Sequence, residues 1–261
     1  MRLTRIVMLA AGLVGLAACS SDDISTTTLP PLGAVRFINA VADTLAVDIR
    51  AIDQVEFSPV VSRLVFRGGT EHQPIEAKSR RFRVFATSTN INVTQVPLLD
   101  ATVDVQANTR VTLLLVGSAR DKSTLRFVTI NDDVTAPPTG MIAVRVVNAA
   151  SGAVNGYLVN AAADPIADPA AAANVAALAQ SPYVTRTAGN AALRFTNVGS
   201  VTVNATAAGP VATVLSGALP AAGVNSAGTK FSVYYFGIGV GNNSAMTTPG
   251  AIWFVDRNPA D

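Results

Sequence analysis

Residues 35–40 read VRFINA, and residues 144–149 read VRVVNA. Apolar and β-branched residues dominate both stretches, which is typical of strands with a packed, pleated surface. Successive side chains of a strand point to opposite faces, so Val35 and Phe37 share one face and Arg36 lies on the other. The two stretches therefore predict equivalent strands near the starts of two copies of one β module.

Three further blocks repeat in the same order, which supports a tandem duplication. They are FRVF and LRFT (82–85 and 193–196), RVTLLLVG and KFSVYYFG (110–117 and 230–237), and LRFV and AIWF (125–128 and 251–254). Gly, Asn, Asp and Pro punctuate the apolar runs, and the expected strands recur about every 8–15 residues, a spacing that favours an antiparallel sandwich over an α/β fold.

The predicted fold class is therefore all-β, with two tandem immunoglobulin-like antiparallel β-sandwich domains after a lipoprotein signal peptide. We expect module 1 at residues 34–134, a linker at 135–140 and module 2 at 141–261.

One alanine-rich stretch interrupts the strand pattern. Residues 168–179 read DPAAAANVAALA, with Asp168 as a helix N-cap and Pro169 at the first helical position. The pattern predicts a short helix inserted between strands, and an irregular alanine-rich loop is the alternative.

The N-terminus has the pattern of a secretory signal peptide. Arg2 and Arg5 precede an uncharged, mostly apolar run at residues 6–18, which is too short to span a bilayer, because a spanning helix needs about 20 residues. The signal peptide is therefore predicted at residues 1–18. No later segment reaches the length of a spanning helix, so we expect no transmembrane helix.

The end of this run, LAAC at residues 16–19, resembles the lipobox of bacterial lipoproteins. The resemblance implies cleavage before Cys19 and a membrane anchor of lipid on its thiol. Residues 19–33 are then a lipidated flexible tether. Ser20 stands where the usual inner-membrane retention signal has Asp, so the expected location is the bacterial outer membrane. An ordinary signal peptide followed by a chance cysteine is the alternative.

The module starts, together with AGNAALRF at residues 188–195, resemble domain-of-unknown-function family 4397 over about residues 34–258. Members are often bacterial lipoproteins or secreted proteins with tandem copies. The resemblance implies a β-sandwich and an envelope location, and it brings no activity. The family's Asp-Val-Tyr strand reads VDI at 47–49 but NGYLV at 155–159, which argues against a shared role for the Asp.

Composition excludes several classes of protein. Hydrophobic residues make up 49% and charged residues 14% of the chain, which excludes intrinsic disorder. A net charge of +2 without a long basic stripe gives no reason to expect a nucleic-acid partner. One Cys and one His exclude a disulfide within the chain and any metal site built from several of these residues. We expect no metal and no cofactor.

The candidate catalytic residues are His72 and Asp132. His72 lies in the turn-rich stretch 68–74, and no G-x-S-x-G elbow supplies a nucleophile, so we expect a solvated loop histidine. Asp132 and Asp133 are expected in a solvated interdomain turn. A calcium site there is disfavoured because the spaced acidic loop pattern is missing.

The densest run of positive charge is KSRRFR at residues 78–83. Its candidate binding residues are Arg80, Arg81 and Arg83. Strand alternation places Arg81 and Arg83 on one face and Arg80 on the other. Such a face could meet anionic lipid headgroups or lipopolysaccharide. A polar sheet face neutralised by acidic neighbours is the alternative.

Aromatic residues gather near the C-terminus, and they are interpreted as the core of module 2, with an exposed glycan or peptide platform as the alternative. They are Tyr234, Tyr235, Phe236, Trp253 and Phe254.

The predicted function is that of a lipid-anchored cell-envelope protein with a non-catalytic binding or scaffolding role. Exposed edge strands or end loops would meet an envelope protein or glycan partner. An adhesin or polysaccharide-binding module is the alternative. A hydrolase built on His72 or Asp132 is the least favoured hypothesis.

Overall fold

The structure is a computed structural model that describes residues 29–53, 60–213 and 221–261. The predicted signal peptide and the predicted lipidation residue Cys19 lie outside these ranges. Leu32–Asp261 forms one compact unit. None of the described helices has the length and hydropathy needed to traverse a bilayer.

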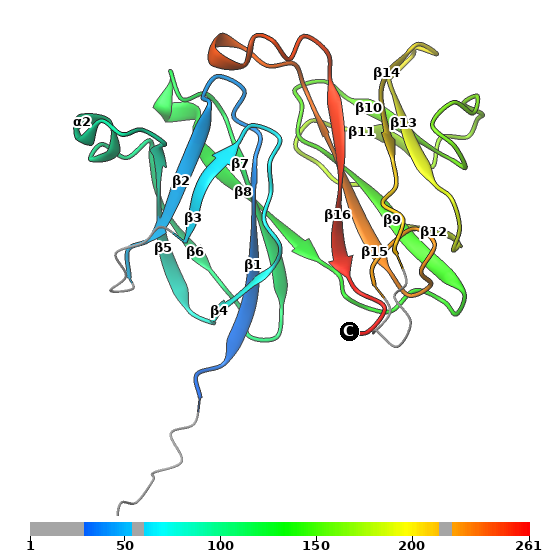
Figure 1. Cartoon of the computed structure of the whole chain (residues 1–261), viewed down its shortest axis with the longest axis horizontal. Coiled ribbons are helices and arrows are strands. Elements are labelled where there is room, and N and C mark those ends of the chain that lie inside the picture. The colour runs from blue at the N-terminus through cyan, green and yellow to red at the C-terminus, as the bar shows by residue number, and fades with distance from the viewer. Residues whose placement is uncertain (1–28, 54–59, 214–220) are drawn as a thin grey trace, which may run out of the picture. The chain divides into compact units, whose positions relative to one another are not determined.

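The first half of this unit is a sandwich of two four-stranded sheets, β4-β1-β7-β8 and β3-β2-β5-β6 (Figure 1). Its strands are β1 (Leu32–Asn39), β2 (Ala46–Ala51), β3 (Val61–Val65), β4 (Gln73–Glu76), β5 (Ser79–Ala86), β6 (Leu99–Asp104), β7 (Arg110–Val116) and β8 (Arg126–Asp132). Two short helices, α2 (Ile91–Thr94) and η1 (Lys122–Thr124), lie in its loops.

The second half repeats this topology with the sheets β12-β9-β15-β16 and β11-β10-β13-β14. Its strands are β9 (Met141–Asn148), β10 (Val154–Val159), β11 (Ala172–Val175), β12 (Val184–Thr187), β13 (Ala192–Asn197), β14 (Val203–Ala208), β15 (Lys230–Phe236) and β16 (Gly250–Arg257), with η2 (Gly241–Asn243) before β16. Each strand has a counterpart at the same place in the first half, so the predicted all-β fold of two sandwiches is confirmed.

The sheets are mainly antiparallel, with one parallel pair in each sandwich. β1 runs parallel to β7, and β9 runs parallel to β15. The two pairs have the same register, since Arg36 lies opposite Thr112 and Arg145 lies opposite Ser232. β1 begins at Leu32, two residues before the predicted start of the first module at residue 34.

Both faces of the central strands are buried, because each sandwich packs against the other. Val35 and Phe37 belong to the core of the first sandwich. Ile38, from the opposite face of β1, packs in a separate cluster with Tyr234 and Phe236 of β15. This cluster joins the sheets β4-β1-β7-β8 and β12-β9-β15-β16 across the boundary between the sandwiches.

The C-terminal aromatic residues are buried or half-buried, as predicted, but they divide between two cores. Tyr235 and Trp253 belong to the core of the second sandwich. Tyr234, Phe236 and Phe254 belong to the cluster between the sandwiches. The contact is close at Gly69, where an added Cβ would lie 2.4 Å from a ring carbon of Phe254.

The predicted helix at residues 168–179 is wrong. Ala172–Val175 forms strand β11, which pairs with β10 at the edge of its sheet and buries Ala172 and Val175. A single short helix is marginally stable in water, so strand pairing and burial override the helical propensity of the alanines. β11 is the counterpart of β3 in the first sandwich.

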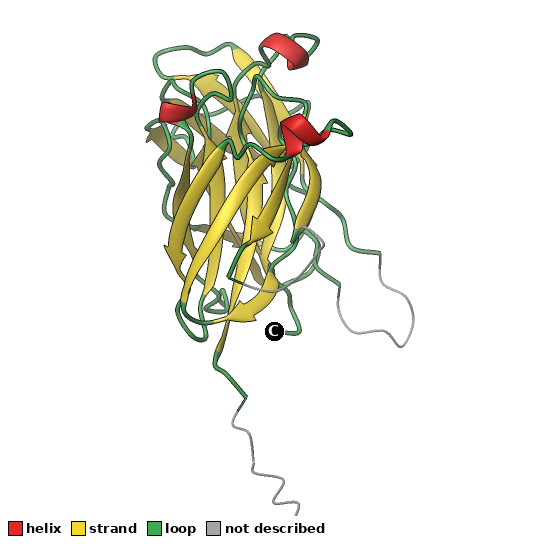
Figure 2. Cartoon of the chain, turned by 90° about the vertical axis from the view of Figure 1, so that its left-hand side faces the viewer, coloured by secondary structure: helices red, strands yellow, loops and turns green. Residues whose placement is uncertain are grey.

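The short helices α2, η1 and η2 lie at one end of the unit, and the C-terminus lies at the other (Figure 2). The long β15–β16 loop reaches the first sandwich at the helical end. There Asn243 Nδ2 donates hydrogen bonds to the carbonyl oxygens of Ala42 at 2.9 Å and Thr44 at 2.6 Å. The two sandwiches are therefore joined by their end loops as well as by their sheets.

Candidate functional site

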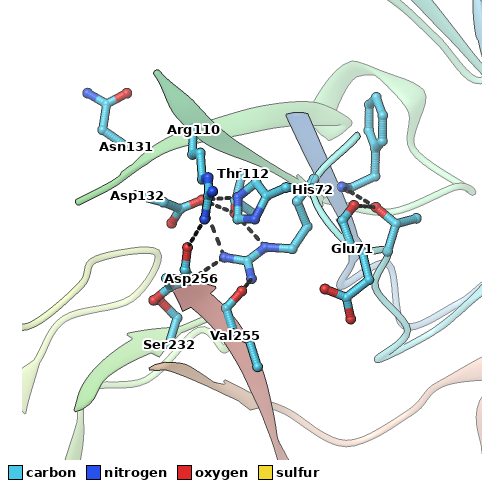
Figure 3. A network of polar contacts seen from close by, with 12 residues as sticks. Glu71, His72, Arg110, Thr112, Asn131, Asp132, Ser232, Val255 and Asp256 are labelled. Carbon is cyan, nitrogen blue, oxygen red and sulfur yellow. Dashed lines mark hydrogen bonds and ion pairs between the residues drawn. The ribbon is translucent and has the colours of Figure 1, made fainter. Parts of the chain in front are cut away.

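The arginine of the first VRxxNA motif lies between the sandwiches. Arg36 is 1% exposed. Its Nε donates to Thr112 Oγ1 on the neighbouring strand at 2.8 Å. Its Nη1 reaches Val255 O at 3.0 Å, and its Nη2 reaches Asp256 Oδ1 at 2.6 Å, both in the second sandwich (Figure 3). The arginine thus connects its own sheet to the facing sheet.

The arginine of the second motif makes the same contacts in the opposite direction. Arg145 Nε donates to Ser232 Oγ at 2.7 Å within its own sheet. Its Nη1 donates to Asn131 O at 3.1 Å, and its Nη2 to Asp132 Oδ1, both in the first sandwich. Asn131 precedes Asp132 as Val255 precedes Asp256, so the contacts of the two arginines are related by a pseudo-twofold axis.

The two aspartates complete this symmetry. Asp132 Oδ2 accepts from Thr112 Oγ1 at 2.6 Å and lies 2.8 Å from His72 Nε2. Asp256 Oδ2 accepts from Ser232 Oγ at 2.6 Å and from the Tyr183 hydroxyl at 2.7 Å. His72 directly precedes β4 and Tyr183 directly precedes β12, so the two residues occupy equivalent places. We call these eight residues the joint: Arg36, His72, Thr112, Asp132, Arg145, Tyr183, Ser232 and Asp256.

Opposite charges offset the cost of burial at the joint. Burial tends to raise the pKa of Asp132, but the His72 hydrogen bond and the charges of Arg36 and Arg145 outweigh burial and lower it. Burial tends to lower the pKa of Arg36, but Asp256 and Asp132 outweigh burial and raise it. Because the ions are paired and hydrogen-bonded, they tolerate burial and fix how the two sheets face each other.

His72 and Asp132 are two of the three groups that a nucleophilic triad uses, but the hydroxyl near them is arranged differently. A triad needs a hydroxyl that donates to the histidine. Here the Thr112 hydroxyl donates to Asp132 and accepts from Arg36. In the second sandwich Tyr183 takes the place of His72, and burial followed by the charge of Asp256 raises its pKa. The shared arrangement is therefore a structural connection between two sheets.

The predictions for His72 and Asp132 are wrong. The His72 side chain is 10% exposed rather than solvated, and it borders a cavity of about 390 Å³ that Glu71, Arg110 and Asn258 also line. Asp132 is buried because the last residue of β8 faces the second sandwich. Asp133 is exposed, and a hydrogen bond from Lys230 of β15, at 2.6 Å, lowers the pKa of Asp133 to about 2.

The described ranges hold no group of three or more His, Cys, Asp or Glu side chains placed to bind a metal ion.

The basic run divides as strand alternation predicted. Arg80 is 0% exposed and pairs with Asp53 at 2.6 Å and Glu76 at 3.2 Å. It is therefore not available at the surface, and the prediction that Arg80 is a binding residue is wrong. Arg81 and Arg83 point outward from β5. Both bind Asp100 of β6, at 2.7 and 2.8 Å.

A further arginine, which the sequence analysis missed, joins this outer surface. Arg50 of β2 lies directly opposite Arg83 of β5. Its guanidinium lies 5.0 Å from the ring centre of Phe85. Within the described residues Arg50 makes no ion pair. We call Arg50, Arg81 and Arg83 the arginine face. Only the pairing of β2 with β5 reveals it, and no local motif marks Arg50.

Aromatic side chains do not form an exposed platform on the described surface. Every Phe, Tyr and Trp in the described ranges is buried or half-buried. The alternative of an exposed glycan or peptide platform is therefore not formed by the described aromatic residues.

Comparison with known proteins finds a domain of unknown function, DUF4397, at residues 33–157. The match runs from β1 into β10, across the boundary between the sandwiches. No curated protein matches the chain.

Two solved structures show weak likeness to the chain. One is the C-terminal domain of AlgF from P. aeruginosa, at 17% identity and a TM-score of 0.25, covering 38% of this chain and 96% of that one. The other is a family CBM26 module of Amy13K from Eubacterium rectale, in complex with maltoheptaose, at 14% identity and a TM-score of 0.25, covering 86% and 95%.

Proposed function

We propose that the chain is a bacterial lipoprotein, anchored in the outer membrane by lipid on Cys19, with a non-catalytic binding or scaffolding role. The LAAC sequence at residues 16–19 supports the anchor, and Ser20 supports the outer membrane. We also infer that the second sandwich is a second module of the same family, since it repeats the strand order and the VRxxNA motif. Its range is proposed as residues 141–261, after module 1 at 34–134 and a linker at 135–140.

The joint is the observation that supports a non-catalytic role. The chain's one histidine is held by a buried aspartate that also binds two arginines. Deprotonating a substrate there would disturb the ion pairs that hold the sandwiches together. The equivalent place in the second sandwich carries a tyrosine, which repeats the structural contact without the basicity of an imidazole.

A body of this kind suits scaffolding because its surfaces keep a fixed relation to one another. The sheets β3-β2-β5-β6 and β11-β10-β13-β14 remain on the outside, and the end loops are joined through Asn243. A partner that contacts both sandwiches would meet an already ordered surface and would lose little conformational entropy in binding.

Metabolic labelling with an alkyne analogue of palmitate tests the anchor. Wild-type protein made in a bacterium should carry the label and remain in the outer-membrane fraction after a high-salt wash. Cys19→Ser should be unlabelled, while Ser20→Ala is the matched control and should be labelled like wild type. Wild-type protein without label would contradict the anchor.

Hydrolysis assays test the non-catalytic role. The purified protein should not turn over panels of ester, glycoside and peptide substrates. A turnover that His72→Gln abolished, with the folded state retained by circular dichroism, would contradict the role proposed here.

A polysaccharide-binding role is the second candidate, and the arginine face is the observation that favours it. An outward cluster of guanidinium groups can recognise acidic sugars without an aromatic platform.

A further inference from the structure

The arginine face places like charges directly opposite one another. Arg50 and Arg83 form a cross-strand pair, and like charges in this position destabilise a sheet. Asp100 is shared between Arg81 and Arg83, so one carboxylate serves two guanidinium groups. The carboxylate of Asp48 accepts from the Thr87 hydroxyl at 2.7 Å and from a backbone amide. Arg50 is therefore the member of the arginine face that has no carboxylate partner among the described residues.

The guanidinium groups are held in position with donors to spare. Asp100 binds Nε of Arg83, and no hydrogen bond among the described residues uses the terminal nitrogens of that arginine. The ring of Phe85 supports Arg50, a contact that restrains a flexible side chain. Arg50 and Arg83 therefore present unused N–H groups from neighbouring strands of a rigid sheet.

We propose that the arginine face binds the carboxylate groups of an acidic polysaccharide of the uronic-acid type. This inference rests on the non-catalytic binding role proposed above and names its ligand. The planar fork of donors on an arginine matches a carboxylate. Arg81 and Arg83 lie two positions apart on one strand face, about 6.8 Å along the strand, so the face offers successive cations to a chain with repeated charges.

A bilayer is a poorer match to this surface than a polysaccharide. Membrane docking by charge uses clusters of about 4–8 basic residues, and amphipathic docking adds apolar side chains that enter the interface. The arginine face has three arginines, and two of them, Arg81 and Arg83, share Asp100. Val65, at the end of the edge strand β3, is the one large apolar residue that is exposed within the four strands of this sheet.

The described residues of the second sandwich do not repeat the arginine face. The counterpart of Arg83 is Arg194, which lies opposite Tyr157 rather than opposite another arginine. Arg194 also donates to the carbonyl oxygen of Asp164. The joint takes equivalent residues from both sandwiches, whereas the arginine face lies on the first sandwich. The structural contact and the proposed binding surface are therefore separate features.

Binding of polygalacturonate tests the inference, with the full chain in a non-ionic detergent and isothermal titration calorimetry at low salt. Wild type should bind polygalacturonate and not dextran. Arg50→Ala should weaken binding about tenfold, as expected for losing a charge-assisted hydrogen bond at an exposed site. Arg126→Ala, which removes an equal charge from an exposed position of β8, should leave the affinity within about twofold.

Asp100→Asn gives a test that a folding defect cannot imitate. It should tighten binding about threefold to tenfold, because it releases Arg81 and Arg83 from their present partner. Asp104→Asn makes the same charge change at an exposed position of the same strand without releasing an arginine, and should have a smaller effect.

Three results would overturn the inference. They are no binding of polygalacturonate by wild type, equal binding of poly-glutamate or phosphatidylglycerol vesicles, and Asp100→Asn binding no tighter than Asp104→Asn. None of them affects the labelling of Cys19 or the hydrolysis assays, so failure of this inference is distinct from failure of the proposed function.

Discussion

Replacing Arg36 with methionine tests whether the joint holds the two sandwiches together. The guanidinium makes three hydrogen bonds, one to its own sheet and two to the second sandwich. Methionine keeps an unbranched apolar chain in the same space, so the loss is mainly one of charge and hydrogen bonds. Asp256 would keep Ser232 and Tyr183 but lose its arginine.

The expected loss is about 3–5 kcal/mol of unfolding free energy, the usual cost of removing one partner of a buried ion pair. The full range applies because Arg36 and Asp256 have side chains that are 1% and 0% exposed. Neutralising the abandoned carboxylate with Asp256→Asn should recover part of the loss. The double variant should therefore be about 1–3 kcal/mol more stable than the sum of the single variants predicts.

Urea denaturation followed by Trp253 fluorescence and far-ultraviolet circular dichroism measures these changes. Trp253 is the chain's single tryptophan and donates to Ala207 O in the second sandwich, so its signal reports unfolding there. Arg126→Met is the control and should stay within about 0.5 kcal/mol of wild type. A loss below about 1 kcal/mol for Arg36→Met, or full additivity in the double variant, would show that the joint does not hold the two sandwiches together.

Three further predictions concern the same architecture. The pKa of Asp132 is lowered in the folded state, so the stability that its ionised carboxylate contributes should be complete above about pH 4 and should fall as the pH drops through the folded pKa. Urea midpoints measured from neutral to acid pH should show this fall. A pH dependence of Asp132→Asn as steep as that of wild type would contradict the prediction. Asn39→Ala should lower the free energy of unfolding by about 2 kcal/mol, because it removes one hydrogen bond to a backbone carbonyl and one from a backbone amide in the buried turn after β1. Thermal or urea unfolding measures this loss, and unchanged stability would rule out that role. Tyr183→Phe should lower the free energy of unfolding by about 1–2 kcal/mol through loss of the hydrogen bond to Asp256. Tyr183→His should lower it by less if a histidine can replace the tyrosine as His72 does in the first sandwich. Chemical denaturation of the two variants compares these losses directly.

Three of the four positions shared by the two VRxxNA copies have distinct physical roles in the first copy. Val35 enters the core of its own sandwich. Arg36 joins the facing sandwich. The Asn39 side chain, 0% exposed, closes the turn by bonding Leu64 O and the amide of Val41, at 2.9 Å each. The second copy repeats all three roles, so the motif that revealed the duplication also builds the contact between its products.

The candidate sites were less predictable than the fold. Strand alternation correctly separated Arg80 from Arg81 and Arg83, because side-chain direction is a local property of the backbone. It could not show that Arg50 faces Arg83, because cross-strand register depends on residues far apart in the chain. His72 and Asp132 were misjudged for a related reason, since their burial depends on a second sandwich that covers them.

Most of the strands, the duplication and the all-β class follow from local sequence patterns, because alternation and turn residues act over a few neighbouring positions. Which polar residues are buried depends on the packing of one sandwich against the other. Arg36 and Arg145 stand in apolar strands where the pattern alone gives them no partner, and each finds a carboxylate only in the other sandwich. Tertiary packing also makes the alanine-rich stretch form strand β11, because pairing with β10 outweighs helical propensity. Local patterns specify elements, whereas the location of charge in this protein depends on the contact between its two halves.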